Sequence, residues 1–268
     1  MPDPAAAEAT GETHPLILIS NDDGIDAPGL RALAEALVDL GEVYVVAPIT
    51  EQSAVGHAIT VRDPVRAREW PQEAFKGVAK AYAVTGTPAD CVKLALGQLV
   101  PRTPALVCSG INNGPNTAVN VIYSGTVSAA TEGTILGIDS IAFSQCAWGG
   151  TDFAESARWA RRIAEEVLRR GLRPGVLLNV NIPFEPKGGV QGIRVTRQAK
   201  ARWEEAFDPR MDPFDQPYYW SKGKFVNLDE GTDTDLAAID EGFVSVTPIH
   251  YDLTAYEALR EVEAWTWE

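Results

Sequence analysis

Short apolar runs alternate with amphipathic stretches over most of the chain. The apolar runs predict buried strands at residues 16–19, 43–47, 81–84, 105–108, 138–144 and 176–182. The stretches between them predict helices, the clearest of which covers residues 152–170. Strands that alternate with helices are typical of an α/β fold, in which helices cover both faces of a mostly parallel sheet. We therefore expect one such core at residues 15–190.

The pattern changes after residue 190, where we expect a C-terminal extension over residues 191–268. It is predicted to hold a strand near 193–196, a short helix that begins at 232–235, a strand at 243–249 and a helical tail at 254–265. Residues 202–225 carry seven aromatic side chains among Pro, Asp and Lys. Such a stretch is too aromatic for disorder, so we expect an extended arm or hairpin that packs on something.

Composition excludes several classes of protein. The formal net charge of −14 disfavours a nucleic-acid polymer as partner, but not a small phosphorylated ligand in a local site. No apolar run is long enough to span a bilayer, so no membrane partner is expected. The three cysteines are far apart, which suits the reducing cytoplasm. Residues 1–14 lack the regions of a signal peptide and are expected to be a disordered extension.

Two adjacent acids follow the first predicted strand. Asn21, Asp22, Asp23 and Gly24 come directly after it, at the end of a strand where open α/β sheets bind ligands. Because neighbouring carboxylates repel one another, a hard cation between them is one interpretation. The other is that Asp22 and Asp23 only form a turn and cap the next helix.

Polar loops follow three further predicted strands and should emerge at the same edge of the sheet. They contain Ser53, the helix start at residues 87–90, and the amide-rich stretch 109–116 with Asn112 and Asn116. Carboxylates, a hydroxyl and an amide carbonyl are oxygen donors, which select Mg²⁺, Mn²⁺ or Ca²⁺ rather than Zn²⁺. Each residue alone is more typical of turn chemistry, so the metal hypothesis rests on their convergence. His57 is either a neighbour of the site or a loop histidine with its own partner.

A predicted helix start at Ser124, Gly125 and Thr126 offers hydroxyls and backbone N–H groups to an anion. The alternative is an ordinary Ser/Thr cap. With a divalent cation on the same edge, phosphate is the natural ligand, since both would neutralise it. The first turn carries neither a Walker A motif nor a Gly-x-Gly-x-x-Gly motif, which argues against a kinase, an ATPase or a dehydrogenase.

Several ordered motifs between about residues 15 and 256 resemble the SurE family, the survival-protein E nucleotidases. They are the stretches 21–25 (NDDGI), 52–54 (QSA), 86–91 (GTPADC), 109–112 (SGIN) with Gly114, 123–127 (YSGTV) and 244–248 (VSVTP). The resemblance implies a Rossmann-like core and a metal-dependent phosphatase that hydrolyses nucleoside 5′- and 3′-monophosphates, with some members also cleaving short polyphosphate. It also implies a homodimer or homotetramer, in which the C-terminal extension packs on a partner subunit.

The resemblance carries the family's site over to this chain position by position. It implies one divalent cation per subunit, Mg²⁺ or Mn²⁺, on Asp22, Asp23, Ser53 and Asn112. It implies phosphate binding around Asn21, Gly24, Asn116, Ser124, Gly125 and Thr126. Three departures stand out: the extension at residues 1–14 has no counterpart, the role of Asn120 is in doubt, and Ser221 and Lys222 follow the aromatic pair of the arm.

Our mechanistic hypothesis is direct hydrolysis by a water that the metal activates. Asp22 or Asp23 would accept the proton of that water, and the sequence leaves open which of them does. Aromatic side chains of the 202–225 arm are candidates to stack on a base, although such residues more often pack in cores or interfaces. Two rival hypotheses are a phosphatase that forms an aspartyl-phosphate, disfavoured because its motif is Asp-x-Asp, and a nucleotide-binding stress protein without catalysis.

Overall fold

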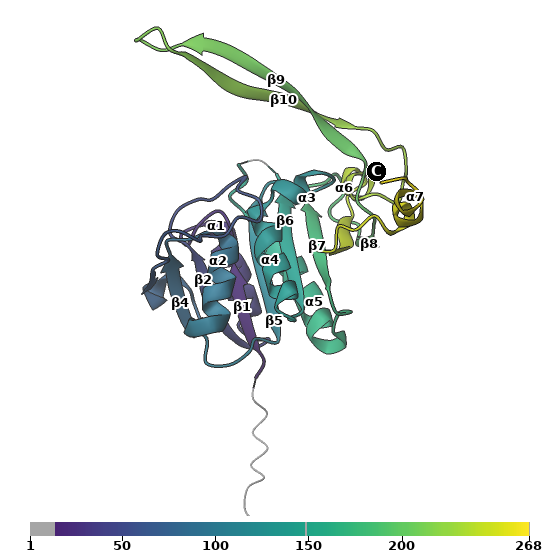
Figure 1. The fold of residues 1–268 in the computed structure, drawn as a ribbon. Coiled ribbons are helices and arrows are strands. Elements are labelled where there is room, and N and C mark those ends of the chain that lie inside the picture. Colours follow the sequence, from purple (N-terminus) through teal and green to yellow (C-terminus); the bar gives the residue numbers. More distant parts are fainter. Residues whose placement is uncertain (1–13, 148, 268) are drawn as a thin grey trace, which may run out of the picture.

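A nine-stranded sheet forms the body of the protein (Figure 1). The structure is a computed structural model that describes residues 14–147 and 149–267, so the predicted disorder of residues 1–14 lies, except for His14, outside the described residues. The strand order is β3-β4-β2-β1-β5-β6-β7-β11-β8. The strands are β1 (Leu16–Ser20), β2 (Glu42–Pro48), β3 (Ala67–Glu69), β4 (Lys80–Val84), β5 (Leu106–Asn113), β6 (Ser140–Cys146), β7 (Val176–Pro183), β8 (Ile193–Val195) and β11 (Val244–His250).

The sheet is mostly parallel, as the alternation of strands and helices predicts. β4, β2, β1, β5, β6 and β7 run parallel, whereas β3 pairs antiparallel with β4, and β11 pairs antiparallel with β7 and parallel with β8. The chain adds β2 and β4 on one side of β1 and then crosses back to place β5 on the other side. The gap between the carboxyl ends of β1 and β5 is therefore the topological switch point, where α/β sheets bind ligands.

Helices cover both faces of the sheet. One face carries α1 (Pro28–Leu37) and α5 (Ala154–Arg170), and the other carries α2 (Pro88–Leu94) and α4 (Gly125–Ile135). The shorter elements are the 3₁₀ turns Gln72–Ala74 and Tyr256–Ala258, the short π-helix Ala95–Leu99, and α3 (Asn120–Tyr123), α6 (Asp235–Asp240) and α7 (Leu259–Glu263). No helix among the described residues is both long and apolar enough to cross a membrane.

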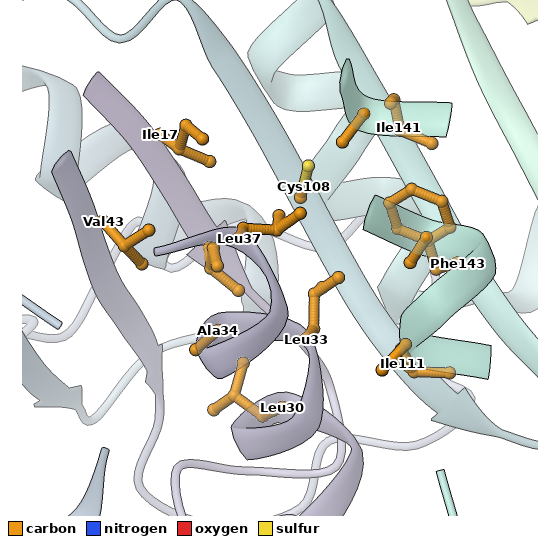
Figure 2. Close-up of a cluster of buried hydrophobic side chains, with 14 of the residues drawn as sticks. Ile17, Leu30, Leu33, Ala34, Leu37, Val43, Cys108, Ile111, Ile141 and Phe143 are labelled. Carbon is orange, nitrogen blue, oxygen red and sulfur yellow. The ribbon is translucent and has the colours of Figure 1, made fainter. Parts of the chain in front are cut away.

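The larger core cluster lies between the sheet and the helices α1 and α5 (Figure 2). Leu30, Leu33 and Leu37 of α1 are fully buried against Ile17 of β1 and Val43 of β2. Their spacing of three and four residues is the apolar stripe that predicts this helix. Because α1 follows β1 directly, this packing fixes the turn that carries the two adjacent acids.

Residues 201–227 form a two-stranded antiparallel hairpin of β9 (Ala201–Met211) and β10 (Pro217–Asn227). It projects from the body of the protein (Figure 1). Many of its aromatic side chains are exposed, among them Phe207, Phe214, Tyr219 and Trp220.

Two predictions from the sequence need correction. A loop was expected at residues 109–116, but β5 continues through Asn113 with an irregularity in its pairing between Ser109 and Asn112. The small and amide residues that indicated a loop therefore extend a buried strand toward the switch point. The helix expected at residues 254–265 is only the 3₁₀ turn Tyr256–Ala258 followed by the short α7.

Candidate metal and phosphate site

A pocket of about 610 Å³ opens at the switch point, where the loops after β1 and β2 meet the end of β5. All four residues expected to bind a metal line it: Asp22, Asp23, Ser53 and Asn112. The other lining residues are Ala27, Pro28, Gly29, Glu51, Ala54, Asn113, Pro115, Asn116, Asn120, Tyr123, Ser124, Phe153 and Trp203. Residues distant in the sequence thus converge as the parallel topology predicts.

Asp22 is nearly buried and is held by the first turn of α4. Only 4% of the residue is exposed, and its Oδ1 accepts a hydrogen bond from the hydroxyl of Thr126. Burial raises the pKa of Asp22, whereas the Thr126 hydroxyl and the backbone N–H groups of Gly125 and Thr126 oppose that rise. A Cβ on Gly125 would lie 2.7 Å from the Cβ of Asp22, so only glycine lets the helix start approach this closely.

Asp23 lies beside Asp22, and its surroundings disfavour the ionised carboxylate. Burial, and then repulsion from Asp22, raise the pKa of Asp23 to about 6. Glu51 adds a third carboxylate to the pocket, and no Lys, Arg or His is among the described residues that line it. The excess of negative charge would be relieved by a bound cation.

The neutral donors of the pocket present oxygen atoms. The hydroxyl of Ser53 donates to Glu51 Oε1 at 2.6 Å, which leaves its lone pairs available. Asn112 donates through Nδ2 to the carbonyl oxygen of Gly114 at 2.8 Å, which leaves Oδ1 as an acceptor. Asn113 Oδ1 is buried and has no hydrogen-bond partner among the described residues.

This donor set fits a hard divalent cation, because it consists of oxygen atoms and contains more than one carboxylate. Within the described residues there is no group of three or more His, Cys, Asp or Glu side chains that could hold a metal. A cation here would therefore depend on the two Asp residues together with neutral hydroxyl and amide oxygens. That composition fits a hard divalent cation better than Zn²⁺.

Four of the residues expected to bind phosphate lie behind the pocket lining. Thr126 and Gly125 face Asp22 rather than open space. Asn21 is fully buried and donates through Nδ2 to the carbonyl oxygen of Gly24 at 2.9 Å. Gly24 has φ +100°, which a residue with a side chain rarely adopts. Asn21 and Gly24 thus shape the turn that presents Asp22 and Asp23.

The other two expected phosphate contacts, Asn116 and Ser124, do line the pocket. Asn116 is fixed by a buried network that sequence reasoning missed. Its backbone N–H donates to Asn181 Oδ1 at 2.8 Å, its Nδ2 donates to Ser144 Oγ at 2.8 Å, and its carbonyl oxygen accepts from Asn179 Nδ2 at 2.8 Å. No local motif in the sequence indicates this network, because its members come from the loop after β5, from β6 and from β7.

A second missed residue ties this loop to the C-terminal part of the chain. Asp235, fully buried at the start of α6, accepts hydrogen bonds from the backbone N–H groups of Ala118 at 2.8 Å and Ala199 at 3.0 Å. Burial raises the pKa of Asp235, and these hydrogen bonds oppose that rise. Asp235 thus links the pocket loop to the root of the hairpin.

One hairpin aromatic reaches the pocket. Trp203 lines it together with Tyr123, and Trp203 Nε1 donates to Asn120 Oδ1 at 2.9 Å. Asn120, whose role the sequence left in doubt, therefore holds an indole at the pocket rim. Trp203 did not stand out individually in the sequence, since the arm was singled out only by its aromatic content.

The loop at residues 87–90 does not line the pocket, although it follows a parallel strand. Thr87 caps α2 in a capping box with Asp90, at the helix start that the sequence predicts. Asp90 also accepts a hydrogen bond from the backbone N–H of Thr60 at 3.0 Å. His57 likewise has its own partner, Glu132, and does not line the pocket.

Comparisons with known proteins agree with this architecture. A family model described as survival protein SurE matches residues 17–205. The 5′-nucleotidase SurE of Christiangramia forsetii is 49% identical over 254 residues, which cover 94% of this chain and 97% of that protein. The 5′-nucleotidase SurE of Heliobacterium modesticaldum is 46% identical, with coverage of 93% and 91%. The crystal structure of the SurE protein from Aquifex aeolicus matches with a TM-score of 0.80 and 42% identity, covering 93% of this chain and 98% of that one. The chain therefore belongs to the SurE family.

Proposed function

We propose that the protein is a divalent-metal-dependent 5′-nucleotidase, a phosphomonoesterase that converts nucleoside monophosphates to nucleoside and phosphate. One observation carries the proposal: an acidic pocket lined by oxygen donors lies at the topological switch point, with no cationic side chain among its described lining residues. An anionic phosphate would enter such a pocket only with a cation. The relatives named 5′-nucleotidase, which align over almost the whole chain, support the substrate class.

Asp22, Asp23, Ser53 and Asn112 would hold the cation, Mg²⁺ or Mn²⁺. When bound, it supplies charge neutralisation at the phosphoryl oxygens and lowers the pKa of a water. Asp22 is fixed by Thr126, whereas Asp23 is the more exposed of the two acids. Asp23 is therefore the better placed to accept the proton of the attacking water.

Asn116 and Ser124 would orient the phosphate from the far side of the pocket. The hydrogen-bond network around Asn116 keeps that residue in one position, and Ser124 is fixed as the N-cap of α4, where its Oγ accepts from the N–H of Val127 at 3.1 Å. Fixed polar groups of this kind contribute to catalysis by holding the reacting group in place. The other four residues lie behind the pocket lining, where they position the two acids: Asn21, Gly24, Gly125 and Thr126.

Trp203 would provide a stacking surface for the base at the pocket rim. Its Nε1 is held by Asn120, and 38% of the residue is exposed, which leaves surface for a ligand. Stacking on an aromatic side chain tolerates different bases, because every base has a π-face. We therefore expect activity on several nucleoside 5′- and 3′-monophosphates, and a short polyphosphate would engage only the phosphate part of the pocket.

Phosphate release from a panel of nucleoside monophosphates with Mn²⁺ or Mg²⁺ tests the proposal. We expect activity that EDTA abolishes. The double variant Asp22→Asn/Asp23→Asn should lose more than the roughly 10–100-fold that is typical when an outer partner of a metal ligand is removed. Asp26→Asn is the matched control, since Asp26 is an exposed acid outside the pocket lining. Full activity in EDTA or in the double variant would refute the mechanism. Nucleotide binding without turnover would favour a non-catalytic binding protein, and a trapped aspartyl-phosphate would favour a covalent mechanism.

We further propose that the hairpin packs on a second copy of this chain, in a cytoplasmic homodimer or homotetramer. The exposed side chains of Phe207, Phe214 and Trp220 support this, because such a concentration of apolar surface marks an interaction site. Cys91, Cys108 and Cys146 are free, in keeping with a reducing compartment. Light scattering should give a dimer or tetramer mass for the full chain and a smaller mass after Phe207→Ser/Trp220→Ser. A wild-type monomer would contradict the proposal.

A further inference from the structure

The loop that follows β2 carries one proposed ligand but has no secondary structure of its own. We call residues 49–60 the site loop; they include Ser53, and no helix or strand occurs between Pro48 and Ala67. Ala54, next to Ser53, has φ +57°, a conformation that costs a residue with a side chain roughly 1 kcal/mol or more. Such a conformation persists only where surrounding contacts hold it.

The contact that anchors the middle of the site loop is a partly buried hydrogen bond between His57 and Glu132. His57 Nε2 lies 2.9 Å from Glu132 Oε2, and only 4% of the Glu132 side chain is exposed. Because the carboxylate accepts, Nε2 of His57 carries the proton in this bond. The other oxygen, Glu132 Oε1, accepts from Lys93 Nζ at 2.9 Å. The two donors differ in origin, since His57 belongs to the site loop and Lys93 to α2.

Glu132 lies on the same helix that holds Asp22. Gly125, whose Cα lies against Asp22, and Glu132 are seven residues apart in α4, so both project from the same face of that helix. A backbone hydrogen bond from Gly56 N to Tyr123 O, at 3.1 Å, joins the site loop to the entry of α4 as well. The same helix, α4, therefore positions both Asp22 and the site loop.

We propose that His57 is a positioning residue, which fixes the site loop on α4 through Glu132 so that the oxygen of Ser53 faces Asp22 and Asp23. The inference rests on the proposed metal site for the role of Ser53, but the ordering of the loop is independent of it. Removing outer partners of metal ligands typically costs about 10–100-fold in metal affinity. His57 contributes to metal binding in this way without touching the metal.

Two measurements on the full-length protein test the proposal. In metal-free protein, hydrogen–deuterium exchange of peptides covering residues 49–60 should be faster in His57→Ala than in wild type. By calorimetry, the same variant should bind Mn²⁺ about tenfold or more weakly. Lys93→Met is the matched control: it also removes a partner of Glu132, yet both readouts should stay at the wild-type level. His57→Gln, which retains a donor near the position of Nε2, should restore part of the lost affinity.

A double-mutant cycle separates positioning from a general loss of stability. If His57 acts through Ser53, then His57→Ala should add little to the loss of Mn²⁺ affinity already caused by Ser53→Ala. Unchanged exchange of the site loop in His57→Ala, or equal effects of His57→Ala and Lys93→Met, would overturn the proposal. Wild-type protein that binds Mn²⁺ but releases no phosphate would refute the proposed function, while the exchange and binding data would still decide the role of His57.

Discussion

Thr126→Val removes the hydroxyl that supports Asp22 and changes little else. Thr126 is fully buried, and its hydroxyl donates to Asp22 Oδ1. Valine has nearly the same shape, so no cavity forms. Because only 4% of Asp22 is exposed, water cannot readily replace the lost donor.

The expected cost follows from the charge of the acceptor. A hydrogen bond to a charged group contributes about 1.5–3 kcal/mol to stability, so the free energy of unfolding of Thr126→Val should fall by that amount. Asp22 also loses a fixed orientation, and we expect about 10–100-fold lower kcat/KM at fixed Mn²⁺. Urea unfolding and phosphate release from a nucleoside monophosphate measure the two effects.

Two variants of the same helix control this experiment. Thr126→Ser keeps the hydroxyl and should retain most of the activity. Thr134→Val removes a hydroxyl of another buried threonine, which donates to the carbonyl oxygen of Ala130 at 3.2 Å, so its activity should be close to that of wild type. Wild-type activity in Thr126→Val, or an equal loss in Thr134→Val, would refute the role that we assign to Thr126.

Three further predictions concern other contacts. Gly125→Ala should lower the free energy of unfolding by about 1–3 kcal/mol in urea titrations and reduce activity, because the new Cβ would overlap the Asp22 side chain; unchanged activity would contradict this packing. Trp203→Ala should raise KM for AMP by about 5–150-fold, the equivalent of about 1–3 kcal/mol of stacking, and leave KM for ribose 5-phosphate unchanged; equal changes for both substrates would exclude a role in base recognition. The hydrogen bond from His57, more than that from Lys93, holds the pKa of Glu132 below its ordinary value of 4.5. Ionised Glu132 therefore stabilises the fold above pH 4.5, and this stabilisation is lost as the pH falls through the lowered pKa. Glu132→Gln should therefore flatten the acid side of the pH–stability curve from urea unfolding, and a curve parallel to that of wild type would refute the assignment.

Local patterns in the sequence predict much of the scaffold. The apolar run before Asp22 and the stripe through Leu30, Leu33 and Leu37 indicate a strand and a helix, because burial imposes a period on both. The capping box at Thr87 also depends only on neighbouring residues. Parallel topology then brings the strand ends together, which is why the sequence alone predicts the convergence of Asp22 with Ser53.

These local patterns do not predict contacts between distant segments. Thr126 was expected to face phosphate, yet its hydroxyl faces Asp22 because the first turn of α4 lies against the turn after β1. In the sequence, Glu132 and Asp235 resemble ordinary acidic residues of helices. Only the folded structure shows that each is buried and accepts hydrogen bonds from distant segments. The continuation of β5 through Asn113 likewise depends on pairing with β6 rather than on residue type.

The most direct test of the proposed metal site is a Mn²⁺ titration of the EDTA-treated protein, in which electron paramagnetic resonance measures the free ion. We predict about one bound Mn²⁺ per chain in wild type and in Asp26→Asn, as expected for a single oxygen-donor site. We predict loss of that binding in Asp22→Asn/Asp23→Asn, together with loss of phosphate release. Mn²⁺ binding and nucleotide hydrolysis that persist in the double variant would contradict the assignment of the two acids.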